Sequence, residues 1–198
     1  MTLYHSTGII AASGGARAKP GMVLLTPTSI AHSGTSASIG ANGQVTFTAV
    51  TSLSLNGVFS AAYDNYVVSI RYENTTGHQE TDLRLRASGT DATGSNYTSQ
   101  LLQANSTTVS AARYTSRSSM FVGFQSDEQR SGETLYLYGP YLAQPTAARN
   151  VNVMGRTGGY IVDYASTHSL STAYDGFTLF GENSYALDGA LQVYGVRS

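Results

Sequence analysis

The stretches that decide the fold are YDGFTLFG at residues 174–181 and LDGALQVYGVRS at residues 187–198. Each places a short run of apolar and aromatic residues after an Asp-Gly pair, a dipeptide typical of tight turns. We interpret them as two closing β-strands with a turn between them. Because a chain that ends on a strand is held by its sheet, we expect no disordered tail after the second strand.

From about residue 22 to this ending, the sequence predicts short strands separated by turn residues. Leu83 and Leu85 alternate with Arg84 and Arg86, as a half-buried strand requires. The predicted strands follow one another at a spacing of roughly 8–12 residues, which is typical of a sandwich or barrel. The sequence predicts an all-β fold, an antiparallel β-sandwich that is jelly-roll-like, with strands at 36–39, 44–47, 52–55, 66–72, 82–87, 97–103, 120–124, 134–138, 150–154, 159–164, 177–180 and 190–194.

Three segments have more specific expectations. Asn42-Gly43 predicts a type I′ hairpin turn, since both residues tolerate positive φ angles. Residues 110–119 could hold at most a turn or two of helix. Residues 1–21, rich in small residues and closed by Pro20-Gly21, predict an extended N-terminal arm or linker before a β domain at 22–198. The alternative for this first segment is a merely irregular terminus.

Composition limits the classes of partner. The 198 residues suit one β domain, and the 12% charged residues are about half the usual share of roughly 25%. Net charge is −1, and Lys19 and ten arginines are spread along the chain, which argues against a nucleic-acid or membrane-surface partner. There is no cysteine, no signal-peptide pattern and no apolar run of about 20 residues. We therefore expect a soluble product made in a cytoplasm.

No catalytic motif is present, so we expect no enzymatic activity and no cofactor. The best metal-capable group is His78, Glu80 and Asp82, which an extended chain would present on one face. Solvated surface residues are the ordinary alternative, and we expect no metal there. The acidic segment 126–133 could offer oxygen ligands to Ca²⁺ but lacks the spacing of a dedicated loop, so a charged hairpin tip is the favoured interpretation.

Tyrosine is the other candidate for binding, since the chain has fourteen tyrosines and no tryptophan. Tyr136, Tyr138 and Tyr141 cluster, and the first two share one face of a predicted strand. Such a face could stack sugars or pack against another protein, because tyrosine offers amphipathic contact area at low entropic cost. We favour protein contact, because Leu135, Leu137 and Leu142 would add apolar surface.

A family resemblance rests on four passages: SLNGVFSAAYDNYVVSIR at 54–71, DLRLR at 82–86, GSNY at 94–97 and LQVYG at 191–195. With them, residues 50–198 resemble a loose group of small tailed-bacteriophage virion surface proteins of tail-fibre, minor structural or decoration type. The resemblance implies a β-sandwich without enzymatic activity. The group has no fixed catalytic motif, so no residue role is carried over.

The resemblance implies a structural protein on the virion surface, assembled in the host cytoplasm: a capsid decoration, a head spike or a tail-fibre component. We expect the arm to dock the protein to other virion proteins of the capsid or tail. We expect the β domain to form a homo-oligomer, and a trimer is one such assembly. One alternative is a carbohydrate-binding receptor-recognition domain of a tail fibre that binds a host surface glycan. Another is a polysaccharide-degrading enzyme with two catalytic carboxylates.

Overall fold

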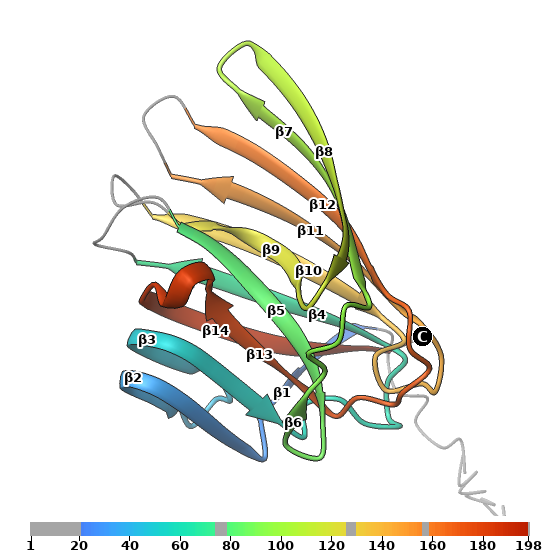
Figure 1. Ribbon diagram of the computed structural model, residues 1–198. Coiled ribbons are helices and arrows are strands. Elements are labelled where there is room, and N and C mark those ends of the chain that lie inside the picture. The colour runs from blue at the N-terminus through green and yellow to red at the C-terminus, as the bar shows by residue number, and fades with distance from the viewer. Residues whose placement is uncertain (1–20, 74–78, 126–129, 156–158, 198) are drawn as a thin grey trace, which may run out of the picture.

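The computed structural model describes residues 21–73, 79–125, 130–155 and 159–197, which form strands and one short 3₁₀ helix (Figure 1). No helix in these residues is long and apolar enough to cross a membrane. The elements are β1 (Gly21–Leu25), β2 (Ser29–Ile39), β3 (Val45–Asn56), β4 (Asn65–Tyr72), β5 (Gln79–Ala87), β6 (Thr90–Asp91), β7 (Tyr97–Asn105), β8 (Thr108–Arg117), β9 (Met120–Gln125), β10 (Ser131–Tyr138), β11 (Thr146–Met154), β12 (Tyr160–His168), β13 (Gly176–Gly181), η1 (Glu182–Ser184) and β14 (Leu187–Arg197).

All strand pairs are antiparallel, and they join into one continuous sheet that curls into a half-barrel (Figure 1). Its order is β6-β5-β13-β3-β14-β4-β10-β11-β12-β7-β8, with β1 on β14, β2 on β3 and β9 on β5. The predicted antiparallel, sandwich-like all-β fold is confirmed. The strand order describes a curled sheet and does not single out a jelly roll.

The curl makes two layers of the sheet, and the strand β3 runs from one layer into the other. Its first half, Val45–Val50, pairs with β14, and its second half, Ser52–Leu55, pairs with β13. Near the end of the first half Ala49 has a φ of 46°, and its backbone N–H donates to Asp188 Oδ1 at 3.0 Å. This bulge bends the strand, so one long strand stands where two short ones were predicted.

The core lies between the layers and is strongly apolar. β9 packs across β10, β11 and β12 on the concave side of the sheet, so both faces of β9 are covered. A second, smaller cluster of Leu101, Phe121, Val162 and Tyr164 lies on the other side of this strand. The main cluster includes Phe47, Leu53, Leu55, Phe59, Tyr66, Val68, Leu83, Leu85, Met120, Val122, Leu135, Leu137, Phe177, Leu179, Leu191 and Val193.

The structure decides two local expectations. Residues 110–119, which could have held at most a turn or two of helix, hold none: most of them belong to β8, a strand that was not predicted and that pairs with β7 from Thr108 to Arg117. The hairpin at Asn42-Gly43 forms, but it is not type I′, because only Gly43 has a positive φ, 79°. Gly43 N–H donates to the Gly40 carbonyl at 2.9 Å, which closes a three-residue loop ending on a left-handed glycine.

Candidate functional site

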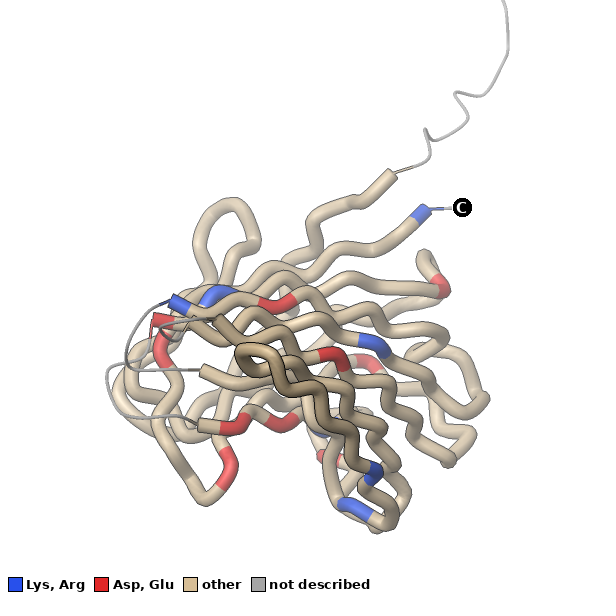
Figure 2. The backbone as a smooth tube through the Cα atoms, turned by 90° about the horizontal axis from the view of Figure 1, so that it is seen from above, with Lys and Arg blue, Asp and Glu red and all other residues tan. Residues whose placement is uncertain are grey.

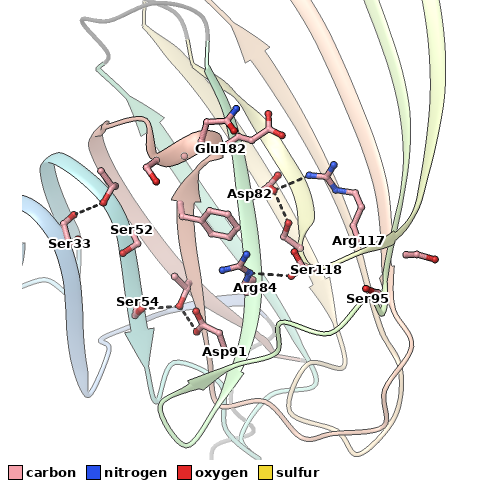
Figure 3. Close-up of a pocket in the computed structure, with 18 residues that line it drawn as sticks. Ser33, Ser52, Ser54, Asp82, Arg84, Asp91, Ser95, Arg117, Ser118 and Glu182 are labelled. Atoms are coloured by element: carbon pink, nitrogen blue, oxygen red, sulfur yellow. Dashed lines mark hydrogen bonds and ion pairs between the residues drawn. The ribbon is translucent and has the colours of Figure 1, made fainter.

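A polar groove of about 800 Å³ lies against β5 and is the main candidate binding site (Figure 3). Its walls come from β2, β3 and β13 on one side and from the β8–β9 turn on the other, with η1 at one end. Hydroxyl groups dominate the lining. The lining residues are Ser33, Thr51, Ser52, Ser54, Asp82, Arg84, Asp91, Ser95, Ser116, Arg117, Ser118, Ser119, Thr178, Phe180, Gly181, Glu182, Asn183 and Ser184.

Asp82 is the most buried charged group of the groove, with 3% of its side chain exposed. Its Oδ2 accepts from Arg117 at 3.0 Å and from the Ser119 hydroxyl at 2.7 Å. Its second oxygen, Oδ1, is buried and has no hydrogen-bond partner among the described residues. Burial raises the pKa of this carboxyl, and the bonds from Ser119 and Arg117 offset part of that rise. The groove thus holds a fixed carboxylate with one acceptor to spare.

Arg84 lies beside Asp82 along the same face of β5, in agreement with the predicted alternation. Its Nε donates to the Ser118 carbonyl at 3.2 Å, and its guanidinium carbon lies 4.3 Å from the centre of the Phe180 ring. The cation–π contact holds the planar group over the ring. Its two terminal nitrogens have no acceptor among the described residues, so they remain free to donate.

Arg86 departs from the prediction that it faces solvent, since only 9% of the residue is exposed. The reason is β6, which pairs with the end of β5 and supplies Asp91, 2.9 Å from Arg86. The Thr178 hydroxyl donates to Asp91 at 2.7 Å and accepts from Arg86 at 2.7 Å. Because its single proton is used on Asp91, the hydroxyl also accepts from Ser54 at 2.9 Å. This network forms one end of the groove.

Glu80 lies two residues before Asp82, next to the groove. The Tyr164 hydroxyl donates to its carboxyl at 3.3 Å. Burial, the nearby Asp82 carboxylate and the nearby Glu182 carboxylate raise the pKa of Glu80 from its ordinary value of 4.5 to about 8. The side chain is therefore largely protonated at neutral pH and can donate a hydrogen bond.

The metal-capable group of His78, Glu80 and Asp82 is brought together only in part. Glu80 and Asp82 lie close together on β5, but His78 and residues 126–129, half of the acidic segment 126–133, fall outside the described residues. In the part of the chain that the structure describes, no three His, Asp or Glu side chains are arranged to hold a metal ion. The protonated Glu80 and the ion-paired Asp82 also lack the free negative charge that a cation site requires.

The three predicted tyrosines separate. Tyr136 and Tyr138 are 41% and 45% exposed on one face of β10, whereas Tyr141 is half-buried against the main core. Leu135 and Leu137 point into the core and offer no outer surface, because strand side chains alternate between faces. Only Tyr136 and Tyr138 therefore share an exposed face.

That same outer face carries an apolar patch, defined by Leu102, Val109, Val151, Val153 and Ile161. Their exposed fractions run from 41% at Val151 to 68% at Val109. The strand register places Val153 beside Ile161, Ile161 beside Ala104, and Ala104 beside Val109. One apolar row thus crosses β11, β12, β7 and β8.

Few charges interrupt this patch. Arg149 and Asp163 form a two-pronged ion pair, with nitrogen–oxygen distances of 3.1 and 2.6 Å, and the strand register places Asp163 within the patch, between Val151 and Leu102. Charged residues are scattered along the chain with long uncharged stretches between them (Figure 2). The strand β8 ends the sheet and, among the described strands, has no partner along its outer edge. The apolar patch therefore extends to the free edge of the sheet, since Val109 lies on β8.

A buried carboxyl elsewhere has a structural role. Glu133 on β10 is buried beside Tyr72, and burial raises its pKa well above the ordinary range. Its Oε2 occupies the place that a Cβ on residue 123 would take, which explains the glycine at that position of β9. Asn152 fixes the same strand by donating to the Phe124 carbonyl at 3.1 Å.

Comparison with known proteins gives no relative: no family model, no curated protein and no solved structure matches the chain. The groove was missed by sequence reasoning, because its lining comes from segments scattered between Ser33 and Ser184. The one usable signal was the polar alternation of Glu80, Asp82, Arg84 and Arg86 in β5. The apolar patch was also missed, since its residues occur singly along four strands.

Proposed function

We propose that the protein is a non-enzymatic structural subunit on the surface of a bacteriophage particle and that it self-associates through its β domain. The apolar patch is the observation that carries self-association. The sequence resemblance supports the phage assignment, as a capsid decoration, a head spike or a tail-fibre component. On this proposal residues 1–21 act as the arm that docks the subunit to other virion proteins.

The patch fits a second copy of this chain. Single exposed apolar residues are normal, but a contiguous row on a sheet marks an interface. The ion pair of Asp163, within the patch, and Arg149, beside it, supplies both signs of charge, so the same surface can face itself without like-charge repulsion. Its position next to the free edge of β8 leaves the approach open.

The assembly is tested by sedimentation and light scattering of the full chain. We expect the wild-type protein to form an oligomer, and Ile161→Asp or Val153→Asp to shift it to monomer. Thr167→Asp is the matched control, since it lies on the same face of β12 but outside the patch. A monomeric wild-type protein, or an Ile161→Asp variant that stays oligomeric, would overturn self-association through this face.

The particle assignment has its own test. We expect mass spectrometry to detect the protein in purified phage particles, and gold-labelled antibodies against it to mark the capsid or the tail. Deletion of residues 2–20 keeps β1 and should abolish incorporation while leaving the fold intact by circular dichroism. Particles that lack the wild-type protein would contradict the assignment, and incorporation of the deletion variant would contradict the docking role of the arm.

A further inference from the structure

We propose that the groove on β5 is a binding site for a neutral saccharide. Eight serines line it, and a serine hydroxyl can both donate and accept a hydrogen bond. The protons of Ser54 and Ser119 are used on Thr178 and Asp82, so these two offer acceptors only. A neutral saccharide presents the same kind of group on every side, so it matches such a lining. This site shares no residue with the apolar patch and does not depend on the proposed assembly.

The fixed charges of the groove select against an ionic ligand. The lining has two guanidinium groups, of Arg84 and Arg117, and three carboxyl groups, of Asp82, Asp91 and Glu182. Arg117 is paired with Asp82, and Asp91 is paired with Arg86 outside the lining. Neither sign is in large excess, so a phosphorylated or polyanionic ligand would find no cluster of cations.

Partnerless groups in the groove provide specific contacts. Asp82 Oδ1 is a buried acceptor without a partner among the described residues, and an unsatisfied group of this kind gains free energy when a ligand hydroxyl donates to it. Arg84 lies two residues further along β5, and its free terminal nitrogens can donate to oxygens of the same ligand. Figure 3 shows the two side chains on one wall, with Ser52 and Ser54 opposite.

The site is preorganised. Arg117 and Ser119 fix the Asp82 carboxylate, and the Phe180 ring together with the Ser118 carbonyl fixes Arg84. A site whose side chains are already held loses little entropy on binding. Its volume of about 800 Å³ is within the range of small-molecule pockets, about 300–1,000 Å³. An oligosaccharide segment therefore fits better than a single small ion.

The experiment is binding of the full-length protein to an array of neutral and anionic oligosaccharides, followed by calorimetry with the neutral glycans that bind. Ser33→Trp fills the mouth of the groove from an exposed position of β2, and Ser36→Trp is the matched control on the same strand outside the lining. Arg84→Ala removes the free donors. We expect Ser33→Trp to abolish binding, Arg84→Ala to weaken it about tenfold or more, and Ser36→Trp to leave it unchanged.

Three results would overturn the proposal: no neutral glycan bound with a Kd below about 1 mM, equal binding by Ser33→Trp and the wild-type protein, or binding of anionic glycans only. Loss of binding on Tyr136→Ala or Tyr138→Ala, with Ser33→Trp unaffected, would place glycan recognition on the outer face and equally overturn it. Because the groove variants leave the apolar patch intact, their oligomeric state should match the wild type, and failure of either proposal can be told from failure of the other.

Discussion

Steric fit and charge burial at single residues make the sharpest predictions. A Cβ at Gly123 would force the buried Glu133 carboxyl to move, although the glycine backbone is not at a positive φ. Gly123→Ala should therefore lower the free energy of unfolding by about 1–3 kcal/mol through overpacking. Urea denaturation measures this.

The control for Gly123→Ala is Gly132→Ala on β10, the next strand in the sequence. There the nearest atom to a Cβ would be the Ile70 carbonyl oxygen at 3.6 Å, an ordinary contact. We expect a change within about 0.5 kcal/mol. Equal losses in the two variants would show that the Glu133 contact is not the cause.

Glu80 should make stability fall with pH. In the unfolded chain the carboxyl loses its proton near its ordinary pKa of 4.5, but in the folded protein it keeps the proton up to about 8. Unfolding between these values releases a proton, so the free energy of unfolding declines as pH rises through this window and levels off above it.

Glu80→Gln should remove that decline and make the variant more stable than wild type at pH 8–9, by about 1 kcal/mol because the side chain is partly exposed and screened. Chemical denaturation at intervals from pH 5 to pH 9 measures the slope. Asp64→Asn, at an exposed position outside the groove, should keep the wild-type slope. An unchanged slope in Glu80→Gln would refute the assignment.

Among the elements, β6 is held by an ion pair rather than by apolar packing. Asp91 on β6 pairs with the nearly buried Arg86 on β5 and accepts from Thr178 on β13. Asp91→Ala would leave the Arg86 charge uncompensated, so we expect a loss of about 2–3 kcal/mol, less than in a fully buried pair because Asp91 is partly exposed.

Asp163→Ala is the comparison for this prediction. It breaks an ion pair of equally good geometry between β11 and β12, but Arg149 is 61% exposed there. Exposed pairs contribute about 0.2–1 kcal/mol. In thermal and urea unfolding we therefore expect Asp91→Ala to be clearly less stable than Asp163→Ala. The reverse order would mean that β6 is not anchored by Arg86.

The elements also show where sequence reasoning succeeds. Residues 82–87 and 134–138 were predicted as strands because their leucines alternate cleanly, and the same leucines are fully buried. β8 was missed because its residues, apart from Val109 and Tyr114, are charged, polar or small and mostly exposed, so no alternation marks them. Pairing with β7, a tertiary contact, makes this segment a strand.

At the scale of the whole molecule, β14 lies inside the sheet although it comes last in the sequence. It pairs with β4 along one edge and with β3 and β1 along the other. A chain truncated after residue 186 should therefore show no cooperative unfolding transition, since β3 and β4 lose their shared neighbour. Deletion of residues 2–20 removes none of these pairs and should retain the transition, as calorimetry would show. A folded truncation product would contradict the central role of β14.

The whole molecule also limits what a sequence can reveal. The closing strands were recognisable from local patterns, but their neighbours were not: β13 pairs with β3 and β5, far away in the chain. The groove depends on this arrangement, because Phe180 meets Arg84 only when β13 lies beside β5. Local patterns therefore predict the strands, and the binding surface emerges from their order.

Because the groove and the apolar patch are separate, self-association would affect how strongly an assembly of this protein binds a glycan-covered surface. Copies joined through their patches would keep every groove open, so one assembly would present several equal sites. Once one site is occupied, the others are confined near the same glycan-covered surface, and the combined avidity can exceed a single affinity by about 10²–10⁴. A saccharide contact that is weak in one subunit would then suffice for lasting attachment, while each contact could still exchange rapidly.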